Sequence, residues 1–164
     1  MELTEDNRLS EENIYQRIII HYNSSMSPLG KPMEFDITRK KINIFKIDKL
    51  YCFKYYFTDQ QVFNELSPYY NKEKYRFECG TAGERNKIIK YPWKVGFDST
   101  IVEDFHEYIV KIDRMKPFIS MLKDSIEQAE IGRDRIFLMK DIRSVEYAIE
   151  QGAERYTDIN RVLF

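Results

Sequence analysis

One segment of the chain carries residues that could hold an anion. Residues 80–87 read Gly-Thr-Ala-Gly-Glu-Arg-Asn-Lys and join an expected strand to an expected helix. Glycines ahead of a helix expose backbone N–H groups at the end where the helix dipole favours negative charge, and the two nearby cations would add to this effect. The candidate anion-binding residues are Gly80, Thr81, Gly83, Arg85 and Lys87.

The same segment has a second interpretation, as a helix cap. It matches neither of the two common glycine-rich phosphate-binding patterns. Thr81 and Glu84 instead form a complete capping-box pattern, and the Glu84 carboxylate would repel a phosphate. We therefore expect capping here and keep anion binding as the alternative.

A second segment, residues 103–107, places three carboxylates and the imidazole of His106 close together. Such groups can ligate a divalent metal or pair a base with an acid. Neighbours in an extended chain point to opposite faces, however, so only some of them could converge, and a solvated turn is the favoured interpretation. The chain has no G-x-S-x-G, C-x-x-C or H-E-x-x-H motif. We expect no catalytic residue, no metal and no cofactor.

A third segment, residues 39–57, is basic and aromatic. Proteins that hold single-stranded nucleic acid combine cations along the backbone with rings on which bases stack. The candidate nucleic-acid-binding residues are Arg39, Lys40, Lys41, Lys54, Tyr55, Lys74 and Arg76. Neither residues 74–79 nor residues 107–112 match the signature of the common RNA-recognition module.

The four rings of Tyr51, Phe53, Tyr55 and Phe57 fall at every other position, so in a strand they share one face. In the structural interpretation, these rings cover the open face of the predicted sheet. Such a face needs a cover or a partner because it carries large apolar groups. The exposure of the four rings decides between the two interpretations. Burial argues against nucleic-acid binding, and exposure beside the lysines favours it.

Composition restricts the class of protein. The chain has 164 residues, of which 43% are hydrophobic and 15% aromatic, so it can bury a core. No apolar run is long enough to span a bilayer, and the first residues are acidic and polar, so we expect no signal peptide and a cytoplasmic location. Residues 31–94 carry fourteen lysines and arginines against eight acids, a net charge of +6, within a total of −1. Cys52 and Cys79 lie in apolar runs and are expected to be buried.

The first 72 residues are predicted to form an extension that packs on a core. Its elements are a helix over 10–22, a loop over 23–32, a β-hairpin of residues 42–47 and 50–57, and a short helix over 59–66. The hairpin turns at Asp48-Lys49, which lacks the glycine that tight turns favour.

Residues 73–164 are predicted to be an α+β core of the ferredoxin-like type, βαββαβ over about 73–139, followed by a helix that begins after Asp141. The predicted elements are strands 74–79, 98–103, 107–112 and 135–139, with helices 81–91 and 117–130. This order places four antiparallel strands in one sheet with both helices on one face.

Three functions remain open. The first is a non-enzymatic interaction module that acts through self-association or binding of a protein partner, because tyrosine and phenylalanine are abundant and are enriched at interfaces. The second is binding of RNA or single-stranded DNA through residues 39–57. The third is an enzyme that uses a phosphate ligand or a metal at residues 80–87 or 103–107.

Overall fold

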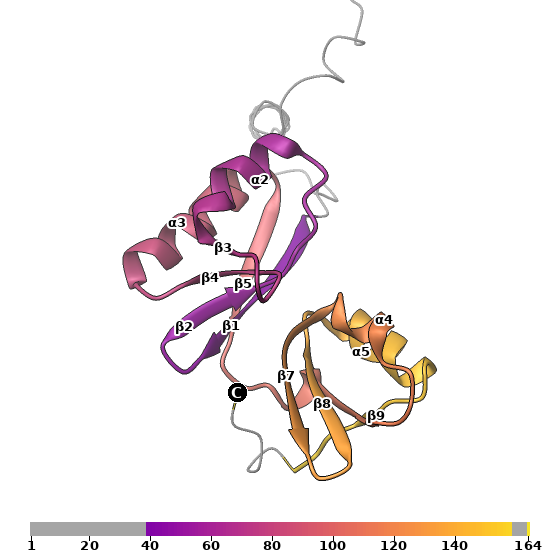
Figure 1. The fold of residues 1–164 in the computed structure, drawn as a ribbon. Coiled ribbons are helices and arrows are strands. Elements are labelled where there is room, and N and C mark those ends of the chain that lie inside the picture. The colour runs from indigo at the N-terminus through magenta and orange to yellow at the C-terminus, as the bar shows by residue number, and fades with distance from the viewer. Residues whose placement is uncertain (1–38, 159–163) are drawn as a thin grey trace, which may run out of the picture.

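Two β-sheets lie back to back between two layers of helices (Figure 1). The computed structural model describes residues 39–158 and residue 164, and this part is a mixed α+β fold with two sheets and four α-helices. The predicted helix over 10–22 and the loop over 23–32 lie outside the described residues. None of the described helices is long and apolar enough to cross a membrane.

The first sheet has five strands in the order β3-β4-β2-β1-β5, and all neighbours are antiparallel except the parallel pair β1 and β5. Its strands are β1 (Lys40–Ile47), β2 (Leu50–Phe53), β3 (Tyr70–Asn71), β4 (Arg76–Cys79) and β5 (Phe97–Val102). Its helices are α2 (Gln60–Leu66), followed by the 3₁₀ turn η2 (Ser67–Tyr69), and α3 (Ala82–Lys94).

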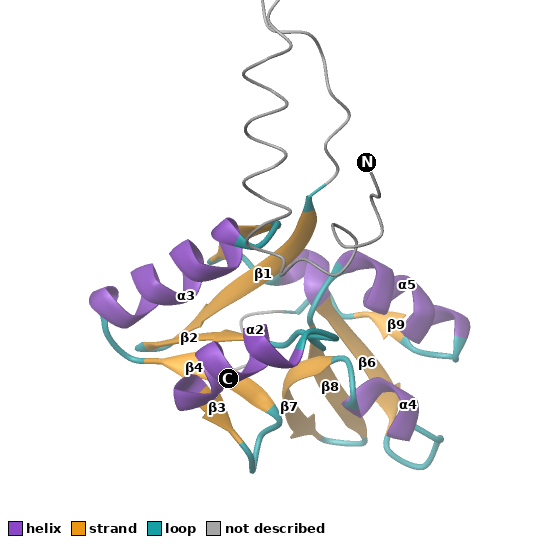
Figure 2. Cartoon of the chain, turned by 90° about the horizontal axis from the view of Figure 1, so that it is seen from above, coloured by secondary structure: helices purple, strands orange, loops and turns teal. Residues whose placement is uncertain are grey.

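The second sheet has four antiparallel strands in the order β7-β8-β6-β9. Its strands are β6 (Ile109–Asp113), β7 (Ser125–Ile131), β8 (Asp134–Met139) and β9 (Glu154–Arg155). Its helices are α4 (Ile119–Leu122) and α5 (Ile142–Glu150), and the 3₁₀ turn η3 (His106–Tyr108) precedes β6. Seen from above, α2 and α3 lie on one side of the molecule and α4 and α5 on the other (Figure 2).

The predicted hairpin is confirmed as the pair β1 and β2, although its second arm, predicted over 50–57, is a strand only over Leu50–Phe53. Strand β1 is apolar on both faces: Ile42 and Ile44 belong to the core under α2 and α3, whereas Phe45 and Ile47 belong to the core between the sheets. Asp48 closes the two-residue turn with φ of 52°, a left-handed conformation that aspartate tolerates better than most residues. The turn therefore forms without glycine.

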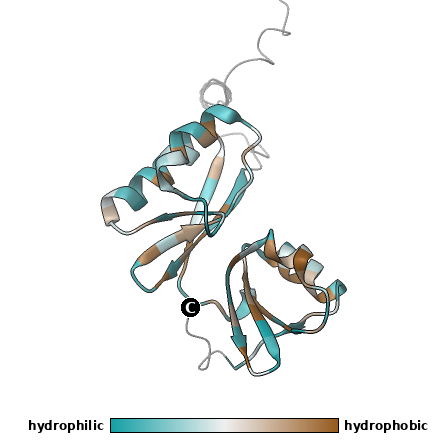
Figure 3. Ribbon diagram, in the orientation of Figure 1, coloured by the Kyte–Doolittle hydropathy of each residue, from teal (hydrophilic) through white to brown (hydrophobic). Residues whose placement is uncertain are grey.

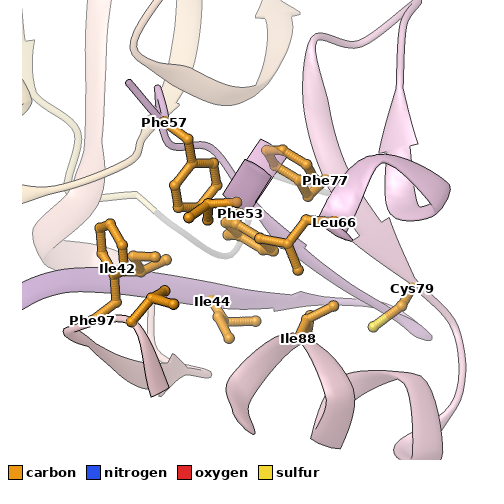
Figure 4. Close-up of a cluster of buried hydrophobic side chains, with 11 residues drawn as sticks. Ile42, Ile44, Phe53, Phe57, Leu66, Phe77, Cys79, Ile88 and Phe97 are labelled. Atoms are coloured by element: carbon orange, nitrogen blue, oxygen red, sulfur yellow. The ribbon is translucent and has the colours of Figure 1, made fainter. Parts of the chain in front are cut away.

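Three hydrophobic cores follow from this layering. The first lies between the first sheet and α2 and α3 and contains Phe53, Phe57, Phe77, Leu66 and Ile88 among others (Figure 4). The second joins the two sheets, and the third lies between the second sheet and its two helices. Hydrophobic residues accordingly recur along the strands of both sheets and on α5 (Figure 3).

The alternating rings of residues 51–57 share one face, as predicted. Phe53 and Phe57 are buried in the first core, and Tyr51 and Tyr55 pack against it. These four rings therefore lie between the first sheet and its own helices, α2 and α3. The second sheet covers the opposite face of the first sheet. The two cysteines, Cys52 and Cys79, are buried free thiols, which confirms the expectation for them.

The predicted single ferredoxin-like sheet over 73–139 is not found. Strands β4 and β5 belong to the first sheet, where β2 and β1 lie between them, and β6, β7 and β8 belong to the second. The reason is that β1 is apolar on both faces, which suits a central strand, and it takes β5 as its parallel neighbour. The two strands predicted on either side of residues 104–106 consequently enter different sheets.

The predicted helix over 117–130 is also wrong. Only α4 is helical, and the chain then forms β7. Ile126 is buried between the sheets and Ile131 packs against the same core, while Gly132, with φ of +62°, turns the chain into β8. The apolar spacing fits a helix, but pairing with β8 buries the same residues and satisfies the backbone along a whole strand.

The predicted helix over 59–66, the one over 81–91 and the one after Asp141 are present as α2, α3 and α5, and α3 and α5 have the predicted caps. The side chains of Asp59, Thr81 and Asp141 accept hydrogen bonds from the first turns of α2, α3 and α5. Helix α3 runs past its predicted end at residue 91, because it includes Pro92 and ends two residues beyond it. Gly152 follows α5 with φ of +101°.

Candidate functional site

The structure does not place the predicted nucleic-acid-binding residues along one continuous path on the surface. The Arg39 guanidinium lies 3.7 Å from the centre of the Trp93 ring and donates a hydrogen bond to the carbonyl of Phe97 at 3.1 Å. Lys40 and Lys41 are exposed at the start of β1. These three cations therefore lie at the beginning of the first sheet, and Arg39 is engaged with neighbouring protein groups.

Lys74 and Arg76 take part in an ion-pair network that joins the two sheets. The buried Arg76 side chain donates to Glu78 Oε2 at 2.9 Å, to Glu127 Oε2 at 2.8 Å and to the carbonyl of Ile126 at 2.9 Å. Lys74 Nζ lies 2.9 Å from the same Glu127 oxygen. The positive charge of this pair of residues is thus largely compensated by the protein.

The predicted anion-binding segment is capped by its own carboxylate. Glu84 Oε2 accepts hydrogen bonds from the backbone N–H groups of Gly80 and Thr81, both at 3.3 Å, and Thr81 Oγ1 accepts from Glu84 N at 3.2 Å. This is the capping box expected from the sequence. Arg85 reaches back over the Tyr51 ring, whereas Gly83 and Lys87 are exposed.

The acidic turn over 103–107 is the connection between the two sheets. His106 Nδ1 lies 2.6 Å from Asp104 Oδ1, and this hydrogen bond raises the pKa of the exposed imidazole. Phe105 instead packs into the core between the sheets, with its ring 5.9 Å from that of Phe45. Within the described part of the chain, no three histidine, cysteine or acidic side chains are grouped so that they could hold a metal ion.

A pocket of about 890 Å³ lies between parts of the two sheets, and we call it the inter-sheet groove. One wall comes from the end of β2, from α2 and from the β3–β4 region, and the other from α4, the residues after it and the end of β8. The lining residues are Lys54, Tyr55, Tyr56, Phe57, Gln60, Phe63, Tyr70, Tyr75, Phe77, Ile119, Leu122, Lys123, Asp124 and Lys140. Half of them are aromatic, so an apolar or aromatic group fits this groove.

The floor and the rim of the groove differ in exposure. Phe57 and Phe77 are buried, with ring centres 5.7 Å apart in a T-shaped arrangement, and they form part of the apolar floor. At the rim, Tyr56 is 84% exposed, Tyr75 is 68% exposed and Ile119 is 78% exposed. These three large side chains come from both walls, and they leave apolar surface in contact with solvent around an apolar depression.

Three lysines and one aspartate supply the charge of the groove. Lys140 Nζ pairs with Asp124 at 2.9 Å. Lys54 Nζ donates to the carbonyl of Leu122 at 3.3 Å, and burial lowers the pKa of this lysine although Asp124 acts in the opposite direction. Lys123 is exposed and forms no ion pair with any other described residue. The lining therefore has a net charge of +2, from three ammonium groups and one carboxylate.

The sequence singles out three of the groove residues, Lys54, Tyr55 and Phe57, and predicts no role for the others that matter. Tyr56 carried a signal, because it falls outside the alternating set of rings and so points away from the core. Lys123 lies within the predicted helix over 117–130 and Lys140 follows the predicted strand over 135–139, so nothing in the sequence places them beside Lys54.

Comparison with known proteins gives no family for this chain, since no family model, no curated protein and no solved structure matches it.

Proposed function

We propose that this chain is a non-enzymatic interaction module that binds a protein partner through the inter-sheet groove. The observation that carries this proposal is the exposure of Tyr56, Tyr75 and Ile119 around an apolar floor. Tyrosines and large aliphatic side chains that surround an apolar depression resemble the anchoring regions of protein interfaces. A partner side chain placed on this floor would remove apolar surface from water on both molecules.

The nucleic-acid alternative has less support. The rings of Phe53 and Phe57 are used in the first core, so they offer no stacking face, and the predicted nucleic-acid-binding cations are separated in the fold. The enzyme alternative has less support still, because the N–H groups of Gly80 and Thr81 bind Glu84.

A site-specific photo-crosslinker tests the proposal. Benzoylphenylalanine is placed at Tyr56 in the groove or, as a control, at Tyr147, which is 41% exposed on α5 and is not a groove residue. In lysate of the source cells, position 56 should give discrete adducts that the additional change Tyr75→Ser abolishes, and position 147 should give none. An adduct of twice the 19.8 kDa chain mass would identify a second copy as the partner. No adduct at position 56, or the same adducts at both positions, would refute the proposal.

A further inference from the structure

We infer that the partner segment bound by the inter-sheet groove is acidic and is anchored by an aromatic side chain. This inference rests on the proposed function and adds the chemistry of the partner. It follows from three features of the groove: the sign of its charge, the nature of its floor, and the arrangement of its cations.

The sign of the charge comes first. Lys54, Lys123 and Lys140 all lie on the lining, and Asp124, the only carboxylate among the described lining residues, is already paired with Lys140. Lys123 has no ion-pair partner among the described residues and is exposed, so it can meet a partner carboxylate without breaking an existing contact. A basic groove attracts an acidic segment and disfavours a basic one, because like charges brought together at an interface cost free energy.

The floor determines the anchor. Phe63 and Tyr70 are half-buried, with ring centres 5.5 Å apart in a T-shaped pair, and both rings lie within 6.0 Å of the buried Phe77 ring. Such a floor accepts another ring in the same edge-to-face geometry, which contributes about 0.5–1.5 kcal/mol per pair beyond the area buried. The hydroxyls of Tyr56 and Tyr75 at the exposed rim can hydrogen-bond to the backbone of the partner segment.

The arrangement of the cations favours a peptide over a nucleic acid. A phosphate backbone needs cations spaced along its path, but Lys74 and Arg76, which lie near this side of the first sheet, are paired with Glu127 and Glu78. Of the three groove lysines, Lys54 donates to the carbonyl of Leu122 and Lys140 pairs with Asp124, so among the described contacts the unengaged cation of the groove is Lys123. A short run of carboxylates beside one aromatic side chain matches this site better than a long polyanion does.

Four defined polymers test the inference with the full chain, by fluorescence anisotropy of the labelled polymer at low ionic strength. They are polyglutamate, a random copolymer of glutamate and tyrosine, a random copolymer of lysine and tyrosine, and oligo(dT). We expect the glutamate–tyrosine copolymer to bind about tenfold more tightly than polyglutamate, and the lysine–tyrosine copolymer not to bind.

Two charge reversals of equal size locate the binding. Lys123→Glu should weaken binding of the glutamate–tyrosine copolymer about tenfold, whereas Lys87→Glu, on the exposed surface of α3 outside the groove, should change it less than about twofold. Tyr75→Ser should bring the affinity for the copolymer down towards that for polyglutamate. Equal losses in the two charge variants, or equal affinity for both acidic polymers, would show unspecific attraction and overturn the inference.

The remaining outcomes separate this inference from the proposed function. Tighter binding of the lysine–tyrosine copolymer would overturn the acidic partner, and tighter binding of oligo(dT) that Lys123→Glu abolishes would assign the groove to a nucleic acid. If no polymer binds but the crosslinker at Tyr56 still captures a partner, the inference fails and the proposed function stands. If both experiments are negative, both fail.

Discussion

Replacement of Arg76 by methionine tests how the two sheets are held together. The Arg76 side chain is 2% exposed and donates to Glu78, Glu127 and the carbonyl of Ile126. Methionine keeps much of the length and apolar volume but removes all three hydrogen bonds. Removal of one partner from a buried ion pair costs about 3–5 kcal/mol. Because the Glu127 side chain is 19% exposed and keeps its contact with Lys74, we expect about 3 kcal/mol.

The assay is urea unfolding followed by circular dichroism, in which the midpoint should fall while the slope stays unchanged. Lys74→Met is the matched control, since it removes a cation from the same Glu127 oxygen but the Lys74 side chain is 50% exposed. We expect this variant to lose less than about 1 kcal/mol. If Arg76→Met costs no more than Lys74→Met, the interpretation of Arg76 as the main polar link between the sheets is wrong.

The loss of stability in the Arg76→Met variant should depend on pH. Burial would raise the pKa of Glu127, but hydrogen bonds from Lys74, from the N–H of Gln128 and from Arg76, together with the Arg76 charge, outweigh it and hold this pKa below its ordinary 4.5. A folded-state pKa below the unfolded one stabilises the protein above the ordinary pKa, and this contribution disappears as pH falls through the folded-state pKa. The stability gap between the wild type and Arg76→Met should therefore narrow from about pH 7 to about pH 3. A gap that stays constant would contradict this account.

Three further predictions concern other parts of the fold. Burial raises the pKa of the thiols of Cys52 and Cys79 to about 11, so a thiol reagent at neutral pH should label neither in the folded protein and both in urea. Thr81→Ala removes the side-chain half of the α3 capping box and should cost about 1 kcal/mol in urea unfolding, and an unchanged midpoint would contradict the cap. Asp104→Asn should lower the pKa of His106 towards its ordinary 6.5 in an NMR titration, whereas an unchanged titration would show that the hydrogen bond to Asp104 is not formed in solution.

Local signals in the sequence predicted local structure. The β1–β2 hairpin follows from runs of β-branched and aromatic residues on either side of Asp48, and α3 follows from a capping box that begins at Thr81. In each case the residues that decide the conformation lie within a few positions of one another. A prediction from spacing alone can succeed there because no distant partner is needed.

Non-local pairing caused the errors. The apolar residues between Phe118 and Ala129 fit a helical stripe, yet Ile126 and Ile131 belong to β7, which pairs with β8 and packs these two side chains against the core between the sheets. The order of elements over 73–139 is compatible with a single sheet, but it contains no information on the β1–β2 hairpin, which inserts between β4 and β5. Tertiary contacts outweigh local spacing when the alternative buries the same side chains.

The candidate site was the least predictable feature because it is a product of the packing between the sheets. Lys54, Lys123 and Lys140 come from three separate regions of the chain and share no motif. Their proximity depends on contacts across the sheets, such as the hydrogen bond of 3.1 Å from Asn43 Nδ2 to the carbonyl of Lys140. A site assembled in this way has no sequence signature to find. The one local indication of the site is Tyr56. Its ring falls outside the alternating set and is 84% exposed, whereas the next ring, Phe57, is buried.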